Sequence, residues 1–166
     1  DAFCSYCIVP FARGPRRSLP LSGVLDGARN FITQGFREIV LTGIHLGDYG
    51  RDLKPATSLT SALVGLLSQN PTARFRLSSI EPNEISDELL ALSGHYRNLC
   101  PHLHIPLQSG DDDILKSMKR RYDTAFYRDL LDRVTRTWAD AAIGIDVLVG
   151  FPGEGEKEFR HTVELL

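Results

Sequence analysis

The chain has 166 residues, of which 42% are hydrophobic and 24% are charged, a composition typical of a globular domain with a buried core. The formal net charge of −2 excludes a basic field over the whole surface, so any nucleic-acid contact has to come from a local patch. No apolar run approaches the roughly 20 residues that cross a bilayer and no leader peptide is visible, so no membrane partner is expected.

In chain order, the apolar pattern predicts an irregular loop over 1–20, followed by alternating helices and strands. Helices are expected at about 22–34, 58–68, 86–94, 111–118, 124–138 and 156–166, and strands at about 38–42, 74–80, 100–107 and 141–149. Ser22 and Ser58 are expected to cap the first two helices. The unbroken apolar run of the first strand favours a parallel strand that is covered on both faces.

This alternation predicts an α/β fold of parallel βα units, which is either a barrel or an open doubly wound sheet. In both architectures, functional groups gather in the loops that follow the carboxyl ends of the strands. The chain places its unusual residues in those loops, at 43–45, 79–82, 108–110 and 150–154.

Cys4 and Cys7 stand three positions apart in the first loop. Two thiolates at this spacing can hold a metal ion or one edge of a cluster, and the pair alone fits a zinc knuckle, a redox dithiol or half of an iron–sulfur site. Three cysteines are too few for a disulfide framework, so a reducing, cytoplasmic setting is expected. Cys100 opens a strand and is predicted to be a buried structural thiol.

The residues around the cysteine pair make it more specific. The run CSYCIVP at 4–10, followed by RG at 13–14 and RRS at 16–18, resembles the cluster loop of the radical S-adenosylmethionine (SAM) methylthiotransferases. The family pattern is C-x3-C-x2-C with an I-V-P…R-G…R-S tail, so its first cysteine is expected immediately before Asp1. Later motifs of the family are matched in order at 41–43 (LTG), 77–82 (LSSIEP), 102–110 (HLHIPLQSG), 119–122 (KRRY) and 146–154 (DVLVGFPGE).

The resemblance implies one radical SAM core domain over 1–166, with a cluster-binding loop at 1–20 and βα units at 21–166. Its fold would be a partial (βα)6 barrel, truncated at both ends, because the first and last strands would lie outside the chain. The amino-terminal methylthiotransferase domain and the carboxy-terminal RNA-binding TRAM domain of the family would lie outside as well. We therefore expect a fragment that lacks full activity on its own.

The resemblance also implies a [4Fe–4S] cluster and SAM as cofactors. Cys4, Cys7 and the residue before Asp1 would hold three irons, and the open fourth iron would chelate the amino and carboxylate groups of SAM, which reduction cleaves to a 5′-deoxyadenosyl radical. The SAM-binding residues expected from the motifs are Tyr6, Gly43, Ser79, Glu81, Gln108, Ser109, Asp146 and Gly150. For Tyr6, loop packing is the alternative interpretation, and Gly43 could be an ordinary turn glycine.

Polar residues within the predicted strands need partners. Asp146 interrupts an apolar strand, where an unpaired carboxylate is costly, so it should have a partner or face a wet barrel lumen. His102 and His104 lie on one strand face and could bind the same metal ion, with His45 as a further candidate ligand. The resemblance gives these histidines no metal role, so hydrogen bonding in the lumen or core is the favoured interpretation.

Two basic clusters could contact tRNA phosphates, or could simply be solvated surface. They comprise Arg13, Arg16 and Arg17 in the first loop, and Lys116, Lys119, Arg120 and Arg121 near the fourth motif.

By its resemblance the chain is an enzyme that adds a methylthio group to carbon 2 of a modified adenosine next to the anticodon. The run TGIHLG at 42–47 and the motif at 102–110 are most similar to the threonylcarbamoyladenosine branch. Its partners would be tRNA and a protein that reduces the cluster. Branches that modify isopentenyladenosine or a ribosomal-protein aspartate stay open, as does a zinc-stabilised RNA-binding module without catalysis.

Overall fold

The computed structural model describes residues 3–166 and shows four short parallel strands. They are β1 (Glu38–Leu41), β2 (Arg74–Leu77), β3 (His102–His104) and β4 (Ala142–Gly144). β1 pairs with β2 and β3 pairs with β4, and parallel bridges from Phe75 to Leu99 and from Ser79 to His104 join the two pairs. The strands therefore follow one another in chain order in a single parallel array, as the βα pattern predicts.

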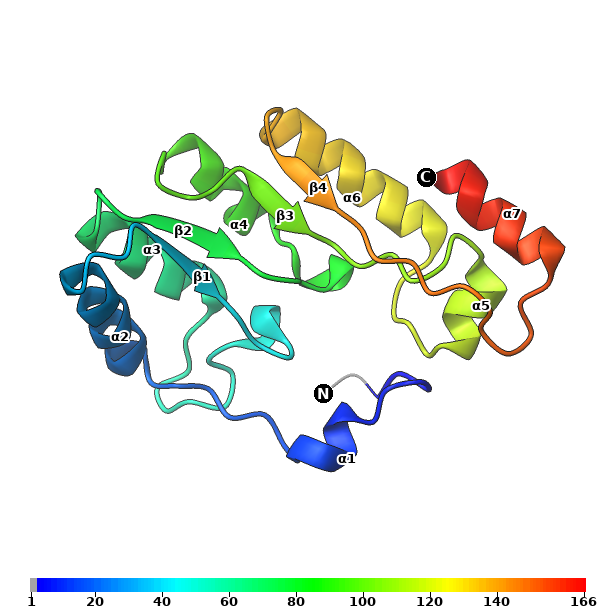
Figure 1. Ribbon diagram of the computed structural model, residues 1–166, viewed down its shortest axis with the longest axis horizontal. Coiled ribbons are helices and arrows are strands. Elements are labelled where there is room, and N and C mark those ends of the chain that lie inside the picture. The colour runs from blue at the N-terminus through cyan, green and yellow to red at the C-terminus, as the bar shows by residue number, and fades with distance from the viewer. Residues whose placement is uncertain (1–2) are drawn as a thin grey trace.

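Helices follow the strands in the order expected of βα units. They are α1 (Val9–Arg13), α2 (Leu21–Thr33), α3 (Leu59–Gln69), α4 (Asp87–Ala91), α5 (Asp112–Ser117), α6 (Thr124–Thr137) and α7 (Glu156–Leu165), with single 3₁₀ turns η1 (Leu46–Asp48), η2 (Pro82–Glu84) and η3 (Leu92–Gly94). Figure 1 shows the units arranged along an arc, from α2 and β1 at one end to β4 and α7 at the other. The expected partial barrel is confirmed.

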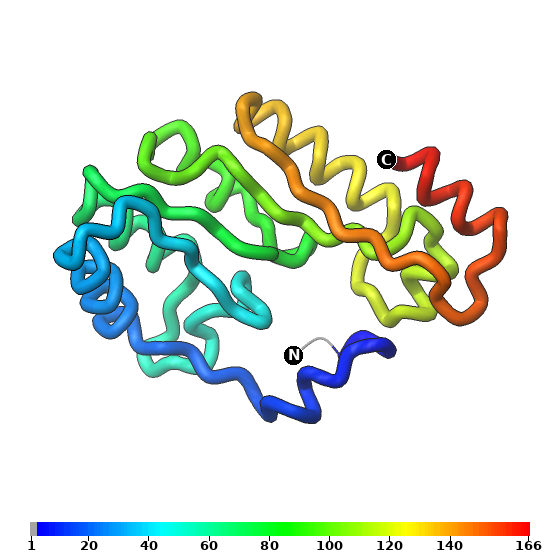
Figure 2. Tube along the Cα trace, in the orientation of Figure 1, coloured from blue at the N-terminus to red at the C-terminus, as the bar shows by residue number. Residues whose placement is uncertain are grey.

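The amino-terminal segment lies across the open side of this arc. Figure 2 shows it running below the segment that follows α5 and below the loop that follows β1, toward the start of α2. Hydrogen bonds fix both contacts, since the Ser5 N–H donates to the Met118 carbonyl over 3.1 Å and Arg16 pairs with Asp48 over 2.6 Å. The segment thus spans the carboxyl ends of the strands, where the predicted site residues gather.

One of the two expected helix caps is confirmed. Ser58 caps α3 by accepting the N–H of Ser61, and Asp111 caps α5 by accepting two backbone N–H groups. The expected cap at Ser22 is wrong, because α2 begins at Leu21 and the N-cap position is Pro20, which offers no side-chain cap. The loop at 1–20 is also not wholly irregular, since α1 forms directly after the cysteine pair with Pro10 in its first turn, where a missing N–H costs nothing.

β3 and β4 are shorter than predicted. Pro106 has no N–H to donate to a ladder, and Gln108 has a φ of 68°, so the chain leaves the strand conformation before the apolar run ends. The coverage predicted for β1 is also wrong, because Val40 on this strand is 50% exposed. The inner face of β1 is open, as expected for a barrel wall whose lumen is not closed by further strands.

The core lies between the outer face of the sheet and the helices. Its fully buried side chains include Phe75, Leu77, Leu103, Ile105, Leu63, Leu66 and Tyr127. Cys100 is 1% exposed and is the buried thiol that the sequence predicts. Among the residues that the structure describes, no helix is long and apolar enough to cross a membrane.

Candidate functional site

The cysteine pair lies in a tight turn at the carboxyl ends of the strands. The N–H of Cys7 donates to the carbonyl of Cys4 over 3.0 Å, and both thiols are free and partly exposed. Between them, the hydroxyl of Ser5 donates to the carbonyl of Ser117 over 2.9 Å, and its N–H donates to Met118. The loop is therefore attached to the last turn of α5, whose terminal carbonyls lack helical donors.

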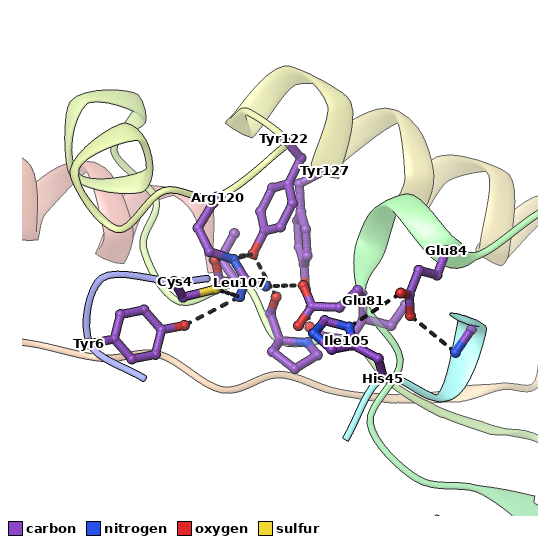
Figure 3. Close-up of polar contacts among 12 residues, drawn as sticks. Cys4, Tyr6, His45, Glu81, Glu84, Ile105, Leu107, Arg120, Tyr122 and Tyr127 are labelled. Atoms are coloured by element: carbon purple, nitrogen blue, oxygen red, sulfur yellow. Dashed lines mark hydrogen bonds and ion pairs between the residues drawn. The ribbon is translucent and has the colours of Figure 1, made fainter. Parts of the chain in front are cut away.

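Arg120 connects this loop to the barrel wall. Its side chain is 3% exposed and forms an ion pair with the carboxylate of Glu81. The same guanidinium donates to the hydroxyl of Tyr122 over 3.0 Å, to Sγ of Cys4 over 3.4 Å and to the hydroxyl of Tyr6 over 3.3 Å. Figure 3 shows these groups converging on one cation from three separate segments. Arg120 thus fixes Cys4 relative to the loop that follows β2.

Burial controls the protonation of the groups around Arg120. It raises the pKa of the Tyr6 hydroxyl to about 12 and also raises the pKa of the Tyr122 hydroxyl, although the guanidinium opposes both shifts. Burial also raises the pKa of the Glu81 carboxyl above its ordinary value, again with Arg120 acting against the shift. At neutral pH the two phenols are therefore neutral hydrogen-bonding groups beside a charged guanidinium.

Two buried tyrosines hold the end of β3. The hydroxyl of Tyr122 lies 3.0 Å from the carbonyl oxygens of both Pro106 and Leu107, and the hydroxyl of Tyr127 donates to the carbonyl of Ile105 over 2.7 Å. Figure 3 shows both phenols meeting the strand exit side by side. These carbonyls lie beyond the β3 ladder, so the tyrosines supply hydrogen bonds that the sheet does not.

A second polar group joins three strands on the open face. The hydroxyl of Ser79 lies 2.6 Å from Nδ1 of His104, and Nε2 of His104 lies 3.2 Å from a carboxylate oxygen of Asp146. Asp146 therefore has a partner, as the sequence requires, and its side chain is 61% exposed. His104 makes hydrogen bonds of the kind favoured over a metal role. The nearby His102 has a buried Nδ1 that finds no partner among the described residues, and desolvation lowers its pKa.

The remaining predicted SAM contacts lie in the strand-exit loops. Gly43 is exposed after β1 and lines a cavity of about 520 Å³ that also reaches Cys7. The backbone N–H of Gln108 donates to the carbonyl of Asp146 over 2.8 Å, so these two exits lie side by side. Gly150 has a φ of 78°, and its N–H points to the carboxylate of Glu154. The structure therefore gathers these loops at one edge.

The geometry removes two residues from their predicted roles. Ser109 is fully buried, and its hydroxyl accepts the N–H of Asp111 and lies 3.5 Å from that of Thr162 in α7, so it faces away from the lumen. Arg120 does not offer its guanidinium to RNA phosphates, because the group is buried and ion-paired. Of the other predicted RNA contacts, Arg16 pairs with Asp48. Arg13, Arg17, Lys119 and Arg121 are exposed.

A parallel βα arc that presents two free thiols at the carboxyl ends of its strands defines an α/β protein of the partial-barrel type with a site formed by two cysteines. The chain belongs to the radical SAM superfamily, whose sequence model matches residues 1–166.

Similar proteins are tRNA-modifying enzymes. The threonylcarbamoyladenosine tRNA methylthiotransferases MtaB of Bacillus subtilis and Thermotoga maritima are 40% and 39% identical to this chain, over 99% and 100% of it. A tRNA-2-methylthio-N(6)-dimethylallyladenosine synthase of Clostridium botulinum is 35% identical over 99% of it. The chain spans only 36–38% of the length of these relatives.

Solved structures support the fold. Two structures of OxsB, a cobalamin-dependent SAM radical enzyme, superpose on 88% and 99% of this chain with TM-scores of 0.60 and 0.64 at 13% identity. At this identity the similarity concerns the architecture alone.

Cys4 and Cys7 fit the [4Fe–4S] cluster that the superfamily implies. Both thiols are free and partly exposed, and the turn between them brings their backbones together. Cys7 borders the cavity of about 520 Å³, and Cys4 borders a second one of about 350 Å³. Within residues 3–166 no group of three His, Cys, Asp or Glu side chains could hold a metal. The third thiolate predicted before Asp1 lies outside the described residues.

Proposed function

We propose that the chain is the radical SAM core of a tRNA methylthiotransferase that acts on carbon 2 of threonylcarbamoyladenosine next to the anticodon. The observation that carries the proposal is the anchored cysteine loop. Ser5 and Arg120 hold Cys4 and Cys7 over the strand exits, where the family motifs predict SAM contacts. The run TGIHLG at 42–47 and the motif at 102–110, which are most similar to this branch, favour threonylcarbamoyladenosine as the substrate.

In this function the residues of the chain bind and orient the reactants. Cys4 and Cys7 hold the cluster, which together with SAM supplies a 5′-deoxyadenosyl radical. Tyr6, with its ring 6.4 Å from that of Phe151, offers an aromatic surface beside the loop. The carboxylates of Glu81 and Asp146 can accept hydrogen bonds from polar groups of SAM, and the hydroxyl of Ser79 can donate or accept one. Gly43 and Gly150 have no side chain and leave the backbone accessible in the loops after β1 and β4. Gln108 lies in the loop after β3.

Partners and setting follow from the same proposal. The substrate is tRNA, and Arg13, Arg17, Lys119 and Arg121 are the exposed cations available to its phosphates. A reductant protein delivers the electron to the cluster, and the reaction takes place in the cytoplasm.

Spectroscopy of the reconstituted cluster tests the proposal. A version of the chain extended upstream of Asp1 is reconstituted anaerobically with iron and sulfide, reduced, and measured by electron paramagnetic resonance with and without SAM. We expect a reduced-cluster signal that shifts on addition of SAM and is lost in the double variant Cys4→Ala/Cys7→Ala, while Cys100→Ala retains it. A protein that stays silent and retains zinc instead would favour a zinc-stabilised RNA-binding module.

The dimethylallyladenosine branch is the second candidate. A dimethylallyladenosine synthase of Oleidesulfovibrio alaskensis is 39% identical to this chain, which nearly equals the identity to the threonylcarbamoyladenosine enzymes. Overall identity therefore does not separate the two substrates, and the chemistry of the substrate-facing residues has to do so.

A further inference from the structure

A cavity of about 350 Å³ lies beside Cys4, between the cysteine loop, the turn η2 and the segment that follows α5. Its volume falls in the range of small-ligand sites. Five arginine and lysine side chains line it against three carboxylates, which leaves a formal charge of +2 when His45 is neutral. The whole chain carries −2. The cavity is therefore a local positive site on an acidic protein.

The ion pairs within the cavity leave part of this charge uncompensated. Asp48 is shared by two guanidinium groups, 2.6 Å from Arg16 and 2.8 Å from Arg51. Glu81 is already paired with Arg120. Lys119 and Arg121 form no ion pair within the described part of the chain. An anionic ligand would thus meet two cations without an ion pair and one arginine in excess over its carboxylate, opposed by the single carboxylate of Glu84 beside His45.

The backbone holds these two cations beside the cysteine loop. Lys119 has a φ of 59°, a left-handed conformation that costs a lysine free energy and that glycine would adopt more easily. The carbonyls of Ser117 and Met118, just before it, accept the two hydrogen bonds from Ser5. The same short segment therefore anchors the loop and places Lys119 and Arg121 in the lining of the cavity that Cys4 borders.

We infer that this cavity binds the carboxylate of the threonylcarbamoyl group and so selects this adenosine over the dimethylallyl one. The inference rests on the proposed function. Threonylcarbamoyladenosine carries a free carboxylate, whereas a dimethylallyl group is uncharged and apolar. Lysine and arginine bind a carboxylate through charge-assisted hydrogen bonds. An apolar group in the same cavity would desolvate Lys119 and Arg121 without giving them a partner, which disfavours it.

Binding measurements on the chain itself test the inference without a loaded cluster. Nuclear magnetic resonance titrations compare threonylcarbamoyladenosine nucleoside, its threonine methyl ester and dimethylallyladenosine, none of which contains a phosphate. We expect the free acid to bind about tenfold more tightly than the ester, the size of one charge-assisted hydrogen bond. Lys119→Gln and Arg121→Gln should each remove most of that difference. Arg97→Gln, an exposed arginine outside the cavity, is the matched control and should preserve it.

Anticodon stem-loops separate the carboxylate from RNA phosphate as the bound anion. If Lys119→Gln and Arg121→Gln weaken an unmodified stem-loop as much as the threonylcarbamoylated one, the site binds phosphate and the inference is overturned. Equal binding of the acid, the ester and dimethylallyladenosine would also overturn it, while leaving a methylthiotransferase of another branch. A chain that binds none of the nucleosides or stem-loops would contradict the proposed function as well.

Discussion

Arg120 and Cys4 are 116 positions apart in the sequence, yet the guanidinium of one lies 3.4 Å from the sulfur of the other. The contact depends on a buried cation whose charge is balanced by Glu81 and whose Nε donates to Tyr122. The cysteine loop is therefore positioned by a residue of the third βα unit, between α5 and α6, rather than by its neighbours in the chain.

Replacement of Arg120 should release the cysteine loop. In Arg120→Ala the carboxylate of Glu81 loses its partner, and breaking a partly buried ion pair in this way costs about 3–5 kcal/mol. We expect the free energy of unfolding to fall by that amount in urea titrations. Arg120→Lys, which keeps the charge but cannot reach all four partners, should fold and show faster amide exchange in residues 3–8. Unchanged exchange there would contradict the tether, and Arg97→Ala is the control.

Removal of the Tyr127 hydroxyl should weaken the exit of β3. Tyr127→Phe leaves the carbonyl of Ile105 without its 2.7 Å hydrogen bond in a fully buried setting, which costs about 1–3 kcal/mol. Urea unfolding measures the loss. Tyr96→Phe removes a hydroxyl from a half-buried residue just before β3, at the end of the strand away from its exit. It should change the stability by no more than about 0.5 kcal/mol. Equal effects of both variants would argue against a role for the hydrogen bond.

Stability should depend on pH through His45. A hydrogen bond to Glu84 raises the pKa of His45 above its ordinary value of 6.5, with Glu81 adding to the shift and burial opposing it. The folded state therefore binds this proton more tightly, so the contribution is fully present below about pH 6.5 and is lost as the pH rises through the raised pKa. The stability difference between wild type and His45→Gln should be larger at pH 6 than at pH 8.5.

Glu84→Gln provides the matched variant for this pH dependence. It keeps an acceptor for the N–H of Gly47, which donates to Glu84 over 3.1 Å, but removes the charge that holds the proton on His45. The same loss of pH dependence is expected in both variants. A difference between wild type and His45→Gln that stays constant over this pH range would contradict the prediction.

A methyl group at Gly110 should separate α7 from the strand exits. An alanine Cβ there would lie 2.5 Å from Cα of Thr162 and 2.8 Å from the carbonyl oxygen of His161, both backbone atoms that cannot move independently. We expect Gly110→Ala to lower the stability by about 1–3 kcal/mol, as overpacking does. Gly94→Ala has open space around its Cβ and should change little. Thermal unfolding of the two variants compares them, and similar melting temperatures would count against this packing.

Local signals in the sequence predict much of the fold. Ser58 caps its helix as expected, because its hydroxyl only has to accept the N–H of a residue three positions later in the chain. The strands were less predictable, because an apolar run does not reveal where pairing ends. The prolines around β3 and the conformation of Gln108 shorten the ladder. The conformation of Gln108 depends on the neighbouring strand as much as on the residue itself.

The site residues were predictable where residue type and spacing are enough to identify them. They were not predictable where the orientation of a side chain decides its role. Cys4 and Cys7 stand out by their spacing. Lys119, Arg120 and Arg121 are equivalent as consecutive cations in a sequence, and only the distant carboxylate of Glu81 determines that the middle one is buried. The role predicted for Ser109 was wrong for a similar reason. The hydroxyl that lies beside its own belongs to Thr162, in a helix more than fifty positions away.

The attachment of Ser5 to the end of α5 also has a temporal consequence. The partners lie 112 positions apart, so a chain synthesised from its amino end exposes both thiols long before Ser117 has left the ribosome. The cysteines acquire their fixed position only when the third βα unit, with β3 and α5, has folded. Metal loading in the geometry seen here therefore has to follow the folding of α5, and a variant that slows the folding of α5 should delay it.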